Sequence, residues 1–377
     1  WDTQFSLYYA RNFGLHNLNA SMTVNGVSTK SESTSSQYRG FPSSEFHSPN
    51  YAAEIYQKPS KSESLKRLMG FVLSANYTWN DVYLADLSVR FDGSSEFGTS
   101  QKWAPFWSGG VGVNVHNYGF LKDSDFVNQL KLRVSYGQTG KVNFPSYAAK
   151  TVYQTYDRWY ATGFGVNLIA LGNENLKWET TNKLNVGTDL QFWNERISLN
   201  FDYYYNKTVD LITDVTLPSS SGFVTYKDNL GETLNEGFDI QVRFDVYKSK
   251  DWNVSLWGNL NHNENKILKV SNALRAYNEQ VDEHFQVAEN AQNGSSPSRD
   301  ETYSTPVMKY EEGASLTSIF AVRSLGIDPV TGKELFLNRD GSVSNTWNSI
   351  QQVRVGDEEP KASGSFGLNL VYKNLSL

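Results

Sequence analysis

Charged residues of both signs recur at alternate positions within segments whose neighbouring residues are apolar. Carboxylates and cationic nitrogens arranged in this way hydrogen-bond neutral, hydroxyl-rich molecules, whereas a simple ion-selective pore favours rings of one sign of charge. The alternative is that these side chains only form a solvated face of a sheet. The residues concerned are Asp86, Arg90, Lys131, Arg133, Asp189, Asp202, Asp239, Arg243 and Asp245.

A second set of candidate contact residues lies in the aromatic-rich segment 139–177. Flat rings beside charged hydrogen-bonding groups stack on sugar rings or peptide side chains, or pack against another protein. A small hydrophobic core private to that segment is the alternative. The candidates are Tyr156, Asp157, Arg158, Trp159 and Tyr160.

The sequence contains no pattern typical of a catalytic, cofactor or metal site. Acidic pairs such as Asp282 with Glu283 are adjacent in the chain, and nothing fixes two carboxylates across a scissile bond. His262 and Glu264 are the nearest approach to a metal-binding pair, but they have no third ligand. Neither a G-x-S-x-G elbow nor a Walker loop is present. We therefore expect no enzyme activity, no cofactor and no metal.

Three glycines, Gly109, Gly110 and Gly112, have only a superficial similarity to a phosphate-binding loop. They lie inside an alternating segment, whereas a phosphate-binding loop connects a strand to a helix. Glycine within a strand typically allows bending or the close approach of another group. We expect bending or close contact with a plug here.

Alternation with a period of two identifies the elements that position the charged residues. Ile197, Leu199 and Phe201 alternate with polar residues, and a pleated strand sends successive side chains to opposite faces. Each such strand therefore has an apolar face and a polar face, and we expect the charged candidates on the polar, inward face. The strands are expected at 4–10, 17–27, 68–79, 82–92, 106–116, 130–137, 184–193, 196–208, 236–247, 252–263 and 366–372, followed by a stub at 375–377.

The long strands and uneven connections favour an all-β membrane barrel. Soluble strands usually have about 5 or 6 residues, whereas a tilted strand needs roughly 9 to 11 to cross a bilayer. Trp79, Trp193 and Trp252 stand beside short turns, where an aromatic girdle is expected. Short turns on one side and long loops on the other are typical of periplasmic turns and extracellular loops. The long loops are expected at 28–66, 139–177, 209–230 and 264–315, with one helical turn in 117–129 and a hairpin in 316–337.

Composition excludes several classes of protein. The 377 residues have a mean hydropathy of -0.51, and none of their windows approaches the roughly 18 apolar residues of a membrane helix. The chain has no Cys, which excludes disulfides and thiolate chemistry. Its net charge of -6 argues against a nucleic-acid partner. The first residues do not have the charged and apolar pattern of a secretory leader, and we expect either that a leader was removed or that this is not the natural start.

Seven short blocks stand out between about residue 66 and the end of the chain. Four of them are 90–98, 103–108, 130–140 and 175–181, and the three others are 202–208, 326–332 and 356–361. These blocks resemble the SusC/RagA family of TonB-dependent transporters of Bacteroidota, and the first four occur in the order typical of that family.

The resemblance implies a 22-stranded outer-membrane barrel with an N-terminal plug. It also implies a SusD-like surface lipoprotein that delivers glycans or peptides, and energy from TonB through the plug. Residues 1–377 would then form a section of one transmembrane barrel domain, without the plug and the final strands. The charged candidates would face the lumen or the plug, and lipid of the bacterial outer membrane would surround the barrel.

Two other functions remain open from the sequence. An outer-membrane barrel that binds a ligand or surface without active transport would have the same strands. A secreted glycan-processing β enzyme would also have aromatic loops, but the acid pair that it needs is missing. The sequence does not name the substrate, because selectivity would reside in loops and in a partner protein.

Overall fold

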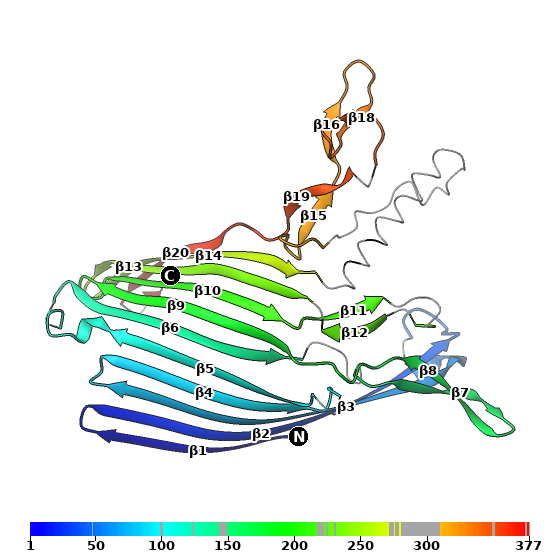
Figure 1. Ribbon diagram of the computed structural model, residues 1–377, viewed down its shortest axis with the longest axis horizontal. Helices are drawn as coiled ribbons and strands as arrows, with labels where there is room; N and C mark the ends of the chain where they lie inside the picture. The colour runs from blue at the N-terminus through cyan, green and yellow to red at the C-terminus, as the bar shows by residue number, and fades with distance from the viewer. Residues whose placement is uncertain are drawn as a thin grey trace.

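The computed structural model describes residues 1–46, 48–98, 101–122, 124–142, 149–216, 222–223, 225–229, 231–270, 275, 279, 310–348, 351–373 and 375–376. Within them the chain forms one large antiparallel sheet of twelve strands, in which spatial order follows chain order (Figure 1). Each inner strand of this sheet pairs with the strand before it and the strand after it in this order, and the first and last strands form the edges. This meander confirms the all-β antiparallel fold expected from the alternation.

The strands of the large sheet coincide with the eleven expected strands and the stub. Several extend further than expected at the end where the long connections lie. They are β1 (Asp2–Phe13), β2 (His16–Arg39), β3 (Glu54–Trp79), β4 (Tyr83–Ser94), β5 (Trp103–Asn114), β6 (Val127–Lys141), β9 (Glu179–Phe192), β10 (Ile197–Val209), β13 (Glu232–Lys248), β14 (Trp252–Lys269), β20 (Ser363–Tyr372) and β21 (Leu375–Ser376).

The short connections gather at one end of the sheet, at the left in Figure 1, and the long ones at the other end. The turn between β3 and β4 has Asn80 and Asp81 at φ 53° and 55°, in the left-handed region that Asn and Asp tolerate better than most residues. Local turn chemistry therefore sets the register of this hairpin. The uneven connections expected from the sequence are confirmed.

The expectation of a loop over residues 28–66 is wrong for most of that segment. β2 continues to Arg39 and β3 begins at Glu54, so the two strands form a long hairpin that extends past their neighbours. Its residues are polar on both faces, so the apolar-polar alternation disappears although the backbone pairing continues. Ion pairs replace apolar contacts on one face, for example between Lys30 Nζ and Glu63 Oε1 at 3.1 Å.

Small sheets occupy the other long connections. β7 (Val152–Tyr160) pairs with β8 (Gly163–Ala170), and β11 (Ile212–Thr216) pairs with β12 (Thr225–Asn229). The expected hairpin in 316–337 is present as β16 (Arg323–Ile327) and β17 (Glu334–Leu337). The remaining short strands are β15 (Ser318–Ala321), β18 (Val343–Ser344) and β19 (Val353–Asp357), which stand off the large sheet beside β14 (Figure 1).

Within 117–129 the expected helical turn is present only as one hydrogen-bonded turn at 118–122. A short 3₁₀ helix, η2, occupies Val115–Asn117, and a turn follows it in which the amide of Lys122 bonds to the carbonyl of Tyr118. Val127 is already the first residue of β6, where it pairs with Phe192. Strand pairing therefore takes Val127, one of the apolar residues on which the helical expectation rests. Among the described residues, no helix is long and apolar enough to cross a membrane.

The apolar face of the large sheet is exposed. Leu87, Val111 and Leu132 lie on this face, and Val111 retains 63% of its accessible surface. Among the described elements, no second sheet pairs with or packs over these strands. A face of this kind is stable only when something apolar surrounds it, and hydrocarbon does so for a membrane barrel.

Aromatic rings line the short-turn end of the apolar face, as expected. Trp79 stacks on Tyr83 with ring centroids 5.3 Å apart, and Trp252 lies 4.5 Å from Tyr372. Trp193 sits in its turn at φ 57°, and the Arg196 guanidinium lies over its ring. Amphipathic rings in this position are typical of the boundary between hydrocarbon and headgroups.

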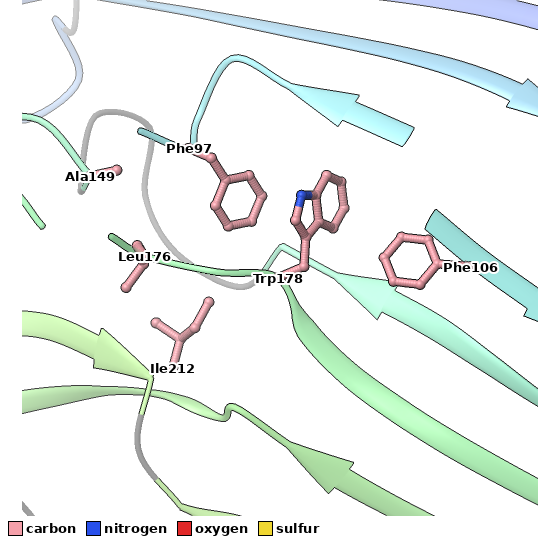
Figure 2. Packing of buried hydrophobic residues seen from close by; sticks show 6 residues of the cluster. All are labelled: Phe97, Phe106, Ala149, Leu176, Trp178 and Ile212. Atoms are coloured by element: carbon pink, nitrogen blue, oxygen red, sulfur yellow. The ribbon is translucent and has the colours of Figure 1, made fainter. Parts of the chain in front are cut away.

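A compact apolar cluster lies at the opposite end, where long connections meet the strands (Figure 2). Phe97, Leu176 and Ala149 are fully buried in it. The Trp178 ring lies 4.7 Å from Phe97 and 5.7 Å from Phe106. This cluster joins four segments that are distant in the sequence. It therefore holds the long connections together at this end of the sheet.

Candidate functional site

The strand register places all nine charged candidates on one face of the sheet. Arg133 of β6 is in register with Gly187 of β9, and Gly187 is in register with Asp202 of β10. The same row continues to Asp239 of β13. Residues in register across a sheet share a face, and period-two alternation extends this relation along each strand. The polar face is therefore continuous from β4 to β13.

One contact on this face joins two strands that are not neighbours. Nη2 of Arg133 donates a hydrogen bond to Oδ2 of Asp202 at 2.7 Å and lies 3.6 Å from Oδ1 of Asp189. The pair crosses directly over Gly187, where a Cβ atom would come within 2.5 Å of Asp202 Oδ1. Glycine in the middle strand is thus what lets the guanidinium reach its partner.

Other candidates also bond within the polar face. Nε of Arg90 lies 2.5 Å from Oδ2 of Asp92, and Nε of Arg243 lies 3.0 Å from Oδ1 of Asp245. Nδ2 of Asn261 donates to Oδ1 of Asp239 at 2.5 Å, and Lys131 stands in register with Asp189 on the neighbouring strand. Several of these cations and carboxylates therefore hold one another in place, and the face presents a wall of hydrogen-bonding groups.

Gly110 lies close to a charged side chain of the neighbouring strand, and contact of the strand glycines with a plug stays a prediction. A Cβ at Gly110 would lie 2.6 Å from Oδ1 of Asp86, the residue in register with it on β4. At the adjacent Gly109, which points to the apolar face, the nearest atom would be 3.7 Å away. The close contact at Gly110 comes from a charged residue of the same wall.

A hollow of about 1020 Å³ opens on the polar face towards the long-connection end. Asn25 of β2 and Asn206 of β10 both line it, although several strands separate them. The sheet must therefore curve around the hollow, so the polar face is the concave one. The hollow also reaches Trp178 and Phe106 of the apolar cluster.

The hollow contains charged residues that the sequence reading missed: Asp92, Lys66, Lys141 and Lys183. Asp92 follows Arg90 at the spacing of two that puts both on one face, and this signal was available in the sequence. The three lysines lie just outside the strands expected at 68–79, 130–137 and 184–193. The alternation therefore does not predict which face of the sheet they occupy.

The aromatic candidates at 156–160 lie on β7, which forms a hairpin with β8 at the long-connection end (Figure 1). The backbone of Trp159 pairs with Phe164, and that of Tyr160 with Gly163. Their side chains lie outside the described part of the structure. The nearby Tyr153, on the same strand, is exposed.

Two asparagines tie the external segments together beside the hollow. Nδ2 of Asn173 donates to Oδ1 of Asp228 at 3.0 Å, and Nδ2 of Asn229 donates to the carbonyls of Lys177 and Asp210 at 2.9 and 2.8 Å. The backbone amide of Lys177 donates a hydrogen bond to Oδ1 of Asn229 at 2.6 Å. These bonds crosslink the segment before β9 to the segment before β13.

Outside the membrane strands, the turn between β16 and β17 is organised by Asp328. Thr331 Oγ1 donates to Asp328 Oδ2 at 2.6 Å and the Val330 amide donates to Oδ1 at 3.0 Å, and these bonds lower the pKa of the Asp328 carboxyl. Hydrogen bonds to a carboxylate favour its charged form. Among the described residues, no group of three or more His, Asp or Glu is placed to hold a metal ion.

Comparison with known proteins agrees with this architecture. The family described as "TonB dependent receptor-like, beta-barrel" matches residues 1–328. The TonB-dependent receptor P3 of Formosa agariphila is 28% identical over 376 residues, which cover 98% of this chain and 37% of that protein. The TonB-dependent receptor SusC of Bacteroides thetaiotaomicron is 33% identical over 215 residues, covering 54% of this chain and 21% of SusC.

The solved structures include a similar fold over the whole chain. The structure of the RagAB peptide transporter superposes with a TM-score of 0.80 at 24% identity, covering 100% of this chain and 39% of the matched one. The chain thus spans less than half the length of each protein that it matches here. The family consists of outer-membrane transporters and not of enzymes. The resemblance to SusC and RagA is confirmed, and the chain belongs to the TonB-dependent receptor β-barrel family.

Proposed function

We propose that this chain forms part of the wall of an outer-membrane importer that moves oligosaccharides or peptides in a TonB-dependent step. One observation carries the proposal: the sheet exposes an apolar convex face and has a polar, ion-paired concave face. Lipid against the convex face explains why that face is apolar, and a path for solute along the concave face explains why that face is polar. The names of SusC and of the RagAB peptide transporter support import of this kind.

In this proposal the nine charged candidates line the lumen. Their mutual ion pairs keep the wall polar without a net excess of one sign, which suits neutral, hydroxyl-rich cargo or a plug packed against the wall. Residues 1–377 form one section of a single barrel domain, and the plug and TonB contact belong to other parts of the polypeptide. No covalent catalysis takes place.

A SusD-like surface lipoprotein is the proposed partner at the long-connection end. β7 and the small sheets there extend beyond the large sheet (Figure 1). Residues 156–160 on β7 are proposed to contact that lipoprotein or its cargo. Aromatic and arginine side chains are enriched at such interfaces.

The test is an uptake assay in the native bacterium. The whole receptor is tagged and isolated from outer membranes, its co-purifying proteins are identified, and uptake of labelled oligosaccharide and peptide pools is measured with and without TonB. The proposal expects a lipoprotein companion and uptake that stops when TonB is removed. Ligand binding at the cell surface without any TonB-dependent uptake would instead support a binding or adhesion barrel.

A further inference from the structure

The hollow on the concave face has a charge balance opposite to that of the chain. The whole sequence has 40 acidic and 34 basic residues. Among the described residues that line the hollow, five are basic and one is acidic: Lys66, Arg90, Arg133, Lys141, Lys183 and Asp92. A concave site with an excess of one sign of charge focuses its electrostatic potential on what enters it.

Ion pairs do not cancel this excess at the surface of the hollow, because each cation is more exposed than its partner. The Lys66 side chain is 36% exposed and Glu96 is 4% exposed. For Arg90 and Asp92 the values are 51% and 15%, and for Arg133 and Asp202 they are 36% and 25%. The cations are thus more accessible than their carboxylate partners, so an entering molecule has better access to N–H donors than to carboxylate oxygens.

The two remaining lysines strengthen this asymmetry. Lys141 is exposed and stands in register with Glu179, which is only 7% exposed. Lys183 is exposed, and its register partners, Gly137 and Asn206, carry no charge. Both ammonium groups therefore have donor capacity for a ligand.

Uncharged hydrogen-bonding side chains surround the lysines. Asn185 and Asn206 supply amides to the same hollow, and Ser108 and Thr139 supply hydroxyls. Groups that both donate and accept are suited to the hydroxyls of a sugar, whereas ammonium and guanidinium groups bind carboxylate or sulfate. The combination favours a ligand that carries hydroxyls and anionic groups together.

We propose that this hollow is a binding subsite for an acidic oligosaccharide, one whose sugar rings bear carboxylate or sulfate groups. The inference rests on the proposed import function and changes its expected cargo from neutral to acidic, because Lys66, Lys141 and Lys183 add positive charge that the nine candidates lack. Lys141 and Lys183 contact the anionic groups, and the neighbouring amides and hydroxyls bind the ring hydroxyls.

The test measures binding to the purified whole receptor by calorimetry. The probes are a galacturonic-acid oligomer, a neutral glucose oligomer of equal length and an oligoglutamate peptide. The wild-type receptor is expected to prefer the galacturonic-acid oligomer, with an affinity that falls as salt is added. The double variant Lys141→Gln/Lys183→Gln is expected to bind that oligomer roughly tenfold more weakly, since two charge-assisted contacts are lost.

A matched control removes the same two charges outside the hollow. The variant Lys30→Gln/Lys61→Gln changes exposed residues of the long β2–β3 hairpin and is expected to leave the affinity within about twofold of wild type, as solvated surface charges contribute little. Thermal unfolding verifies that both double variants are folded. An equal loss in both variants would show a general charge effect and overturn the subsite.

Other outcomes also overturn it. Equal or tighter binding of the neutral oligomer would remove the anion requirement, and preference for oligoglutamate would make the ligand an acidic peptide. TonB-dependent uptake, measured in parallel, separates the two proposals. Uptake that persists without any preference for acidic sugars refutes the subsite alone, whereas loss of all TonB-dependent uptake in the wild type refutes the import function.

Discussion

Nη2 of Arg133 on β6 lies 2.7 Å from Oδ2 of Asp202 on β10, and the backbone of β9 passes between them at Gly187. The contact joins three strands at a single point of the concave face. Arg133 also lies 3.6 Å from Asp189, so its charge is shared between two carboxylates. The Arg133 guanidinium thus contributes both to the stability of this wall and to its polarity.

Arg133→Met and Asp202→Asn, made singly and together, are expected to show coupling. Both side chains are partly exposed, which reduces the Coulomb energy, so we expect a coupling of about 0.5 to 1 kcal/mol. Unfolding of the solubilised receptor in denaturant gives the three free-energy changes. Additive changes would mean that Asp202 does not hold the Arg133 charge.

Gly110→Val is expected to destabilise the receptor by about 1 to 3 kcal/mol, because the new side chain collides with the Asp86 carboxylate. Gly109→Val, at the adjacent position on the apolar face, provides the control. Its nearest neighbour would be 3.7 Å away, and a valine suits a lipid-facing strand position. The thermal unfolding midpoint of Gly110→Val is expected to be lower than that of Gly109→Val. Equal midpoints would contradict the placement of Gly110 against the Asp86 carboxylate.

Much of the large sheet could be predicted because alternation and turn residues are local signals. Ile197 and Phe201 identify the apolar face of β10, and Asn80 and Asp81 identify a turn. Strand ends at the long-connection side could not be predicted, since beyond Val27 both faces of β2 are polar and the period vanishes. Lys141 and Lys183 were missed for the same reason. Cross-strand pairs such as Arg133 with Asp202 depend on register, which no single strand encodes.

Val134→Arg is expected to cost about 2 to 4 kcal/mol and to reduce assembly, because Val134 lies on the apolar face of β6. Ser135→Arg, one residue along, places the same charge on the concave face and is expected to assemble normally. The fraction of folded receptor in outer membranes is read from the mobility of unheated samples in SDS gels. Equal assembly of the two variants would mean that lipid does not contact the Val134 side.

Acidification is expected to loosen the turn between β16 and β17. The pKa of Asp328 is lowered in the folded state, so its stabilising bonds are present above the usual carboxyl pKa and are lost as pH falls through the lower folded value. Hydrogen exchange at Gly332, whose amide bonds to the Asp328 carbonyl at 2.8 Å, reports the loosening after correction for intrinsic rates. In Asp328→Asn this pH dependence should be absent. If it persists there, another group controls the turn.

The most direct measurement is the accessibility of single spin labels placed along β6 of the receptor in lipid vesicles. This chain has no Cys, so cysteines introduced one at a time at 132, 133, 134 and 135 give defined labels within it. Labels at 132 and 134 are predicted to be relaxed by oxygen, which concentrates in hydrocarbon, and labels at 133 and 135 by a water-soluble nickel reagent. A profile without this two-residue alternation, or with the two reagents reversed, would contradict the placement of the apolar face in lipid and the polar face towards the lumen.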